Sequence, residues 1–325
     1  MHPAFSVIFL TTLIGAGQGL FLALYTGQVY SVVQVLPTQS GQNFYGMGSL
    51  LALAFLVAGL FASFFHLGHP ERAWRSAAQW RTSWLSREVI ILPIFMALVT
   101  TYGGIHYFNL DYNMATLGAI TVTPSLILGF VTTFICVLLY VCTAMIYACI
   151  RFIQEWATPL TLANFLLLGS SSGLTLATAF SAIIHSELTA FFALWAIIFT
   201  SVAMAFRVIS LIRNSRIKFK SSPKTAIGVR HGKIQQKSQG AMGGSFNTRE
   251  FFHGKSIIFV KNVRTISLLL VFVAPIFLLS LISQENSLQL SVAAFVVQYL
   301  GLIAERWFFF AQANHPQNIY YQTIS

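Results

Sequence analysis

The chain has 325 residues, of which 56% are hydrophobic and only 8% are charged. A soluble domain carries roughly 25% charged residues, so this composition excludes a protein whose main solvent is water. The formal net charge of +11 lies mostly in the segments that separate long apolar runs, so nucleic-acid binding is not needed to explain it.

Eight apolar runs are long enough to cross a bilayer, because a spanning helix needs about 20 residues. Helices are expected since hydrocarbon offers no partners for backbone amides, whereas a barrel would show short alternating segments. We therefore predict an all-α polytopic membrane protein, with residues 1–325 as a single integral-membrane domain. The predicted spans are about Ala4–Tyr30, Phe44–Phe65, Val89–Phe108, Leu117–Ile150, Leu160–Ile183, Leu188–Ile212, Thr265–Ser283 and Leu288–Phe310.

Small residues within the spans predict close helix packing. Gly15 and Gly19 are four apart, and Gly169–Gly173 encloses three serines. The first cluster is not expected to be a phosphate loop, because neither a strand nor a following lysine accompanies it. Pro93 and Pro275 fall inside spans and are expected to kink them.

Two features near and within the apolar runs have simple interpretations. The first run begins close to Met1 without a basic segment before it, which favours a retained helix over a cleaved signal. Cys136, Cys142 and Cys149 share one run and have no CxxC spacing. We expect them to be small packing residues and not metal ligands or a disulfide framework.

The basic residues are distributed on one side of the predicted membrane. We call the side that holds the amino terminus side A and the opposite side B. Of the 19 lysines and arginines, all but Arg207 and Arg306 fall in the side A connections Leu67–Glu88, Arg151–Pro159 and Arg213–Arg264. The side B connections carry only the acidic residues Asp111, Glu187 and Glu285. Because Lys and Arg stay on the cytoplasmic side during insertion, side A and both termini are predicted to be cytoplasmic.

The longest connection, 213–264, is a basic loop inserted between the sixth and seventh spans. It could be a flexible segment attracted to anionic lipid headgroups, or a dock for an acidic soluble partner. Phe251-Phe252 and Ile257–Val260 could lie at the membrane interface as a short amphipathic piece.

The connection between the second and third spans carries the densest polar chemistry outside that loop. His66, at the cytoplasmic end of the second span, can exchange a proton near neutral pH. Arg72 and Arg75 can donate hydrogen bonds to a carbonyl oxygen and favour an anionic intermediate, and Trp74 can stack on a flat ring. Glu88 begins the third span and could relay protons. These groups suit a quinone headgroup, but His66 could also only cap a helix and the arginines could only anchor it.

A family resemblance favours the quinone interpretation. The stretch His66-Leu67-Gly68-x-Pro70-x-Arg72-Ala73, followed by Ser86-x-Glu88, resembles the signature of the membrane anchor subunits of dimethyl sulfoxide reductase. The resemblance covers most of the chain and implies eight helices in the bacterial cytoplasmic (inner) membrane. It implies an anchor that binds quinone (ubiquinone or menaquinone) and has no redox metal of its own. The expected partners are an iron–sulfur subunit and a molybdopterin catalytic subunit.

The resemblance also assigns residues. The family's quinol-linked histidine falls on His66, its motif arginine on Arg72 and its glutamate on Glu88, and Arg306 in the last helix carries over better than Glu305. The expected quinone-binding set is His66, Arg72, Trp74, Arg75, Glu88 and Arg306, with proton transfer by His66 and Glu88. Docking of the partner is expected at Arg81, Arg87, Arg151, Arg216, Lys218 and Lys220. No catalytic residue or metal ligand is expected in this chain.

Orientation favours one reaction. Dimethyl sulfoxide reductases of the family work on the outer face, whereas sulfite-oxidising relatives work in the cytoplasm, where side A is predicted to lie. The opening His2-Pro3-Ala4-Phe5-Ser6 and the stretch Trp156–Gly169 also resemble the sulfite-oxidising members. The preferred hypothesis is an anchor that passes electrons from sulfite to quinone. The first alternative is an anchor of a dimethyl sulfoxide reductase-type complex that oxidises quinol.

Other functions remain as alternatives. A passive structural anchor would need no quinone site. A transporter is disfavoured because the spans hold almost no ionisable residue at mid-depth and no repeated halves. A b-type haem needs two facing histidines. His106 and His185, near the side B ends, could hold one haem or could both lie at the outer interface, and we expect no haem.

Overall fold

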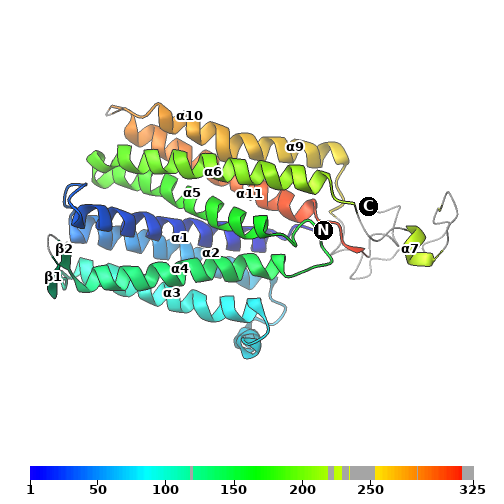
Figure 1. Ribbon diagram of the computed structural model, residues 1–325, viewed down its shortest axis with the longest axis horizontal. Helices are drawn as coiled ribbons and strands as arrows, with labels where there is room; N and C mark the ends of the chain where they lie inside the picture. The colour runs from blue at the N-terminus through cyan, green and yellow to red at the C-terminus, as the bar shows by residue number, and fades with distance from the viewer. Residues whose placement is uncertain (118–119, 219–222, 229–233, 235–252, 284, 317–325) are drawn as a thin grey trace.

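The computed structural model describes residues 1–117, 120–218, 223–228, 234, 253–283 and 285–316. Within these residues, eight helical segments are long and apolar enough to cross a membrane, which confirms the predicted number of spans. The eight run side by side as one bundle (Figure 1). They are α1 Phe5–Val32; η1 Gly41–Gly46 continued by α2 Met47–Ser63 and η2 Phe64–His66; α3 Trp84–Tyr107; α4 Pro124–Ala148; α5 Pro159–Ile184; α6 Thr189–Ser215; α9 Ile257–Leu268 continued by η5 Leu269–Val273 and α10 Ala274–Ser280; and α11 Ser287–Ala311.

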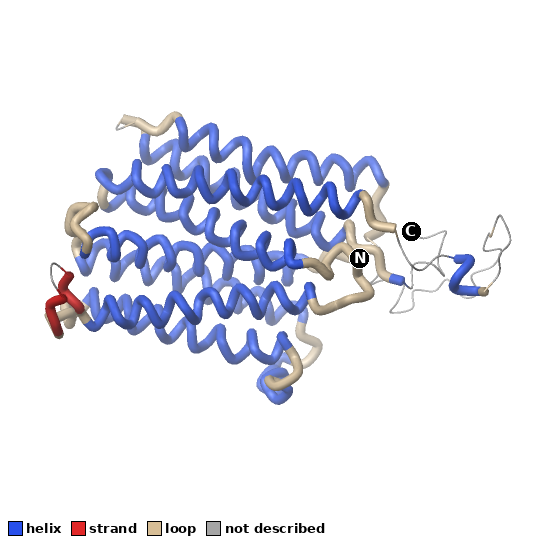
Figure 2. The backbone as a smooth tube through the Cα atoms, in the orientation of Figure 1, coloured by secondary structure: helices blue, strands red, loops and turns tan. Residues whose placement is uncertain are grey.

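Short elements connect the spans. They are the 3₁₀ helices η3 Pro70–Gln79 and η4 Ser186–Leu188, the short helix α7 Pro223–Ile227, and the strands β1 Ala115–Leu117 and β2 Ile120–Val122. The two strands pair antiparallel, and Figure 2 shows them at the end of the bundle opposite α7. The fourth span is therefore shorter than predicted, since Leu117 ends β1, Ile120–Val122 form β2 and α4 begins only at Pro124. Thr123 and Pro124 explain the later start, because Thr123 caps the helix and proline suits its first position.

Two other boundaries differ from the prediction. The seventh span begins at Ile257 and not at Thr265, because the Ser256 hydroxyl accepts a hydrogen bond from the Phe259 amide and caps the helix. Ile257–Val260 is thus the first turn of α9 and not a separate interfacial piece, and Phe251-Phe252 lies outside the described residues. The third span begins at Trp84, capped by Ser83, so Glu88 lies one turn inside it.

The helix around Pro275 shows how a proline is accommodated. Proline has no amide hydrogen, so the carbonyl of Val271, four residues earlier, loses its helical partner. The intervening turn is the π-helix η5, and Gln298 of α11 donates from Nε2 to that carbonyl at 3.3 Å. The carbonyl that loses its partner because of the proline is thus bonded by a side chain of the neighbouring span.

The centre of the bundle is formed by α1 and α5. Buried residues make up 67% and 78% of their most apolar windows, against at most 39% in the other six spans. Their glycines allow the close contact, because a Cβ added at Gly19 would lie 2.3 Å from the Gly169 carbonyl oxygen. The predicted packing role of these small residues is confirmed. Cys136 and Cys142 are buried and Cys149 is exposed, all as free thiols.

The amino terminus and the last span end on the same side of the bundle. The main-chain nitrogen of Met1 donates to the Ala313 carbonyl at 3.0 Å, and Trp156 donates from Nε1 to the Phe309 carbonyl at 3.1 Å. The amino terminus and the end of α11 therefore lie together at side A, the end of the bundle at which η2 and η3 also lie. Its cytoplasmic location remains a prediction from charge.

Candidate functional site

The structure divides the six predicted quinone residues into two groups. His66, Arg72, Trp74 and Arg75 are exposed at side A, with Trp74 71% exposed. Glu88 and Arg306 are buried in the bundle, with exposed fractions of 8% and 4%. The predicted set is thus not a single pocket, and the groups can have different roles.

The exposed group lies on and beside the 3₁₀ helix η3. Figure 1 shows η3 almost end-on while the spans lie in the plane of the page, so its axis runs across the bundle. Pro70 begins η3, and the Ser86 hydroxyl of α3 donates to the Ser76 carbonyl, which attaches η3 to the bundle. Trp74 and Arg75 thereby remain on a surface that faces away from the core.

Aromatic and cationic side chains alternate along this surface. Arg87 lies over the ring of Trp84 at 4.2 Å and donates hydrogen bonds to the carbonyls of Trp80 and Arg81. The other cation–π pairs are Arg75 with Trp74 at 5.6 Å and Arg81 with Trp80 at 5.4 Å. Such pairs keep positive charge at the membrane interface and can accept a flat ring or a carboxylate.

The predicted docking residues are at side A as far as the structure describes them. Arg87 is partly buried and Lys220 lies outside the described residues. The exposed members are Arg81, Arg151, Arg216 and Lys218. These four positive charges are available to an acidic partner.

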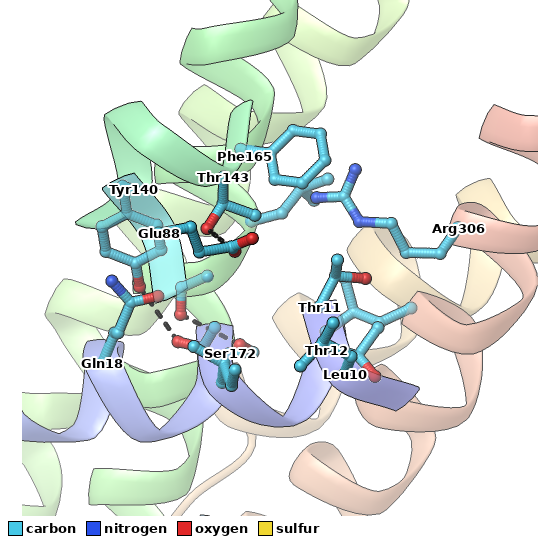
Figure 3. A pocket seen from close by; sticks show the side chains of 15 residues that line it. Leu10, Thr11, Thr12, Gln18, Glu88, Tyr140, Thr143, Phe165, Ser172 and Arg306 are labelled. Atoms are coloured by element: carbon cyan, nitrogen blue, oxygen red, sulfur yellow. Dashed lines mark hydrogen bonds between the residues drawn. The ribbon is translucent and has the colours of Figure 1, made fainter. Parts of the chain in front are cut away.

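The buried group lines a narrow, partly open cavity with about 20 Å³ of space for solvent, between α1, α3, α4, α5 and α11. Figure 3 shows Glu88 and Arg306 directed into it from opposite sides. The Thr143 hydroxyl donates to the Glu88 carboxylate, and further lining comes from Thr11, Thr12 and Ser172. A space of this size holds about one water molecule, so a quinone ring does not fit in the cavity.

Two contacts hold Arg306 in place. Its guanidinium lies 3.7 Å from the centroid of the Phe165 ring, and its Nε is 3.7 Å from the Glu305 carboxylate. Phe165 belongs to an aromatic cluster at side A in which Trp156 stacks on Phe309 at 5.3 Å. Stacking on aromatic rings lets a charged guanidinium remain buried.

Sequence reasoning missed the role of Arg207 and gave Glu305 little weight. The Arg207 Nη2 lies 2.8 Å from the Glu305 carboxylate, and both side chains are buried. A signal was available, because ionisable residues inside spans are costly and therefore need a partner. What the sequence could not supply was which residue in another helix is that partner.

Tyr140 and Gln18 line the part of the cavity that lies further from side A. The Tyr140 hydroxyl donates to the Gly15 carbonyl at 2.9 Å, and Gln18 donates from Nε2 to the Cys136 carbonyl at 3.0 Å. These donors are thus bonded to backbone. The cavity can hold a proton or a water molecule between Glu88 and Arg306.

The two histidines considered for a haem lie near side B. The ring of His106 is enclosed by Tyr45 at 4.6 Å and Tyr102 at 4.8 Å, and His185 contacts Phe44 at 6.1 Å. Aromatic packing accounts for both positions.

One carboxyl group outside the spans gives a pH-dependent prediction. Burial raises the pKa of Glu155 above its ordinary value of 4.5, although the Asn314 amide donates to its carboxylate at 3.1 Å. The folded state therefore binds this proton more tightly than the unfolded state does, and the resulting stability is lost as the pH rises through the raised pKa. We expect Glu155→Gln to reduce the fall in melting temperature as the pH rises above about 4.5. The same change of melting temperature with pH in the wild-type protein and in Glu155→Gln would contradict this expectation.

Known proteins resemble this chain along almost its whole length. The sequence model of the DMSO reductase anchor subunit (DmsC) family matches residues 1–312. The chain is also 58% identical to a sulfite dehydrogenase subunit of Allochromatium vinosum, over 326 aligned positions that cover 100% of both sequences.

Proposed function

Because this chain belongs to the DMSO reductase anchor subunit family and is a membrane anchor of an oxidoreductase complex, we propose that it passes electrons between a partner iron–sulfur subunit and quinone. We propose sulfite as the substrate of the complex, oxidised by a molybdopterin partner. The support is the relative with 58% identity, which is a sulfite dehydrogenase subunit. Quinol oxidation by a dimethyl sulfoxide reductase-type complex is the second candidate, favoured by the family match alone.

We propose different steps for the two groups of the site. The exposed surface around His66 and η3 is where a quinone ring meets the membrane interface. Arg72 and Arg75 donate hydrogen bonds to its oxygen, Trp74 stacks on it, and His66 exchanges a proton. The partner's cluster supplies the electrons, and the exposed arginines of side A bind the partner's carboxylates.

The cavity between Glu88 and Arg306 is proposed to take part in the proton transfer that accompanies quinone reduction. Reduction of a quinone to quinol takes up two electrons and two protons, so a proton donor must act near the ring. Glu88 is almost completely buried and can hold one proton there, and Arg306 offsets its negative charge when the proton has left. The single observation that carries this proposal is that Glu88 and Arg306 face each other across a water-sized cavity (Figure 3).

The orientation is a proposal with its own test. We propose a bacterial inner-membrane protein with side A in the cytoplasm, because its connections carry nearly all the basic residues. A fluorescent reporter fused after Ser325 should be active in the cytoplasm, and a periplasmic phosphatase reporter should be active when inserted between Leu117 and Ile120. The reverse activities would contradict both the orientation and the choice of a cytoplasmic reaction.

His66→Ala tests whether the chain is more than a passive anchor. We expect quinone-linked turnover of the assembled complex to fall by about 100-fold, which is typical of removing a group that transfers protons. The matched control is His69→Ala, since His69 is exposed on the same segment and its ring pairs with the exposed Glu71 at 3.0 Å. Unchanged turnover in an assembled His66→Ala complex would favour the passive anchor.

A further inference from the structure

The Glu305 carboxylate lies between two arginines and is closer to one of them than to the other. It is 2.8 Å from Arg207 of α6 and 3.7 Å from the Nε of the neighbouring Arg306. The side chains of Arg207 and Glu305 are only 3% and 2% exposed. Arg207 lies eight residues before the end of α6, about 12 Å along the helix, so the pair is held in a region of low dielectric.

Because Arg306 is the more distant of the two arginines, its guanidinium can point toward the cavity and not toward Glu305. Its guanidinium packs on Phe165 and lines the cavity opposite Glu88 (Figure 3). The two arginines balance Glu305 and Glu88 in charge only when Glu88 is ionised. Without Arg207, Glu305 would be a buried carboxylate whose nearest cation is Arg306 on its own helix. Because an unpaired buried charge is strongly unfavourable, Arg306 would turn toward Glu305 and away from the cavity.

We propose that Arg207 is a positioning residue, which engages Glu305 and so keeps Arg306 directed at Glu88. This inference rests on the proposed proton exchange by Glu88. The other ionisable groups near Glu88 come from its own helix and from α4, while the side chains that α1 and α5 place at the cavity are uncharged. They are Arg87, Tyr140, Cys142 and Tyr147.

The experiment compares five variants in the complete complex, reconstituted in nanodiscs. Quinone-linked kcat and KM are measured from pH 5 to 9, and electron transfer to a soluble acceptor checks the catalytic partner. We expect Arg207→Gln to lower kcat about tenfold at neutral pH, with KM changed less than about twofold. Its alkaline limb should move to higher pH, since Glu88 without its cation is a weaker acid and gives up its proton only in more alkaline solution. Arg207→Lys should keep most of the turnover.

The decisive variant is Arg207→Gln combined with Glu305→Gln. Without the competing carboxylate, Arg306 should remain at the cavity, so the double variant should recover the wild-type pH profile. Arg213→Gln is the matched control, because Arg213 lies on the same helix and donates to the Gln154 carbonyl at 2.7 Å.

A wild-type profile in Arg207→Gln, or a double variant as impaired as the single one, would overturn the positioning role. Wild-type turnover in Glu88→Gln would instead overturn the proposed role of Glu88, and this inference with it. The two failures are thus distinguishable. If Arg207→Gln does not assemble, the double variant and Arg207→Lys still decide the question.

Discussion

Replacing Glu88 by glutamine is expected to lower quinone-linked turnover by about 100-fold or more, the usual effect of removing a general acid or base. Glutamine keeps the size of the side chain and can still accept the hydrogen bond that Thr143 donates. It cannot take up or release a proton, and it leaves Arg306 without an opposing charge across the cavity. The measurement is kcat for quinone in the assembled complex. Electron transfer to a soluble acceptor, which bypasses the anchor, should be unchanged.

The matched control is Glu155→Gln. Glu155 is also a buried carboxyl at side A, but it does not line the cavity. Its replacement should alter the pH dependence of stability and leave quinone-linked turnover as it is. Equal losses in both variants would show that any buried carboxyl at this end is needed for assembly, and the specific role of Glu88 would be wrong.

The spans could be predicted from sequence because a helix that crosses the membrane needs about 20 consecutive residues that are mostly apolar. Length and hydropathy therefore identified all eight. The same reasoning missed the β1–β2 hairpin, because hydropathy measures the preference for an apolar environment and not the backbone conformation. The run from Leu117 to Val122 is apolar but rich in β-branched residues, which favour strands.

The site is harder to predict than the spans, because residues that are neighbours in the sequence need not be neighbours in the structure. Arg87 and Glu88 are adjacent, but successive side chains on a helix point about 100° apart. Arg87 therefore stacks outward on Trp84, while Glu88 turns inward to Thr143. The partner of Glu88 across the cavity, Arg306, is more than 200 positions later in the chain. Only the packing of five helices brings these two together.

Replacing Gly173 by alanine is expected to have the largest effect on stability. A Cβ at this position would lie 2.0 Å from the carbonyl carbon of Gly19 and 2.2 Å from its Cα. Both atoms belong to the backbone of α1, so no side chain can move aside and the two central helices must separate. Overpacking typically costs 1–3 kcal/mol, and we expect at least about 3 kcal/mol here because the obstacle is main chain.

The measurement is the yield of monodisperse protein in detergent together with its thermal unfolding. The matched control is Gly104→Ala on α3, because nothing lies within 4 Å of a Cβ at Gly104. This control should unfold at or above the wild-type temperature, since alanine is the better helix former by about 1 kcal/mol. If Gly173→Ala unfolds at the temperature of the control, α1 and α5 cannot be in contact at these glycines. The cavity that α1 and α5 enclose with α3, α4 and α11 would then have a different shape, and the assignment of Glu88 and Arg306 to one site would lose its basis.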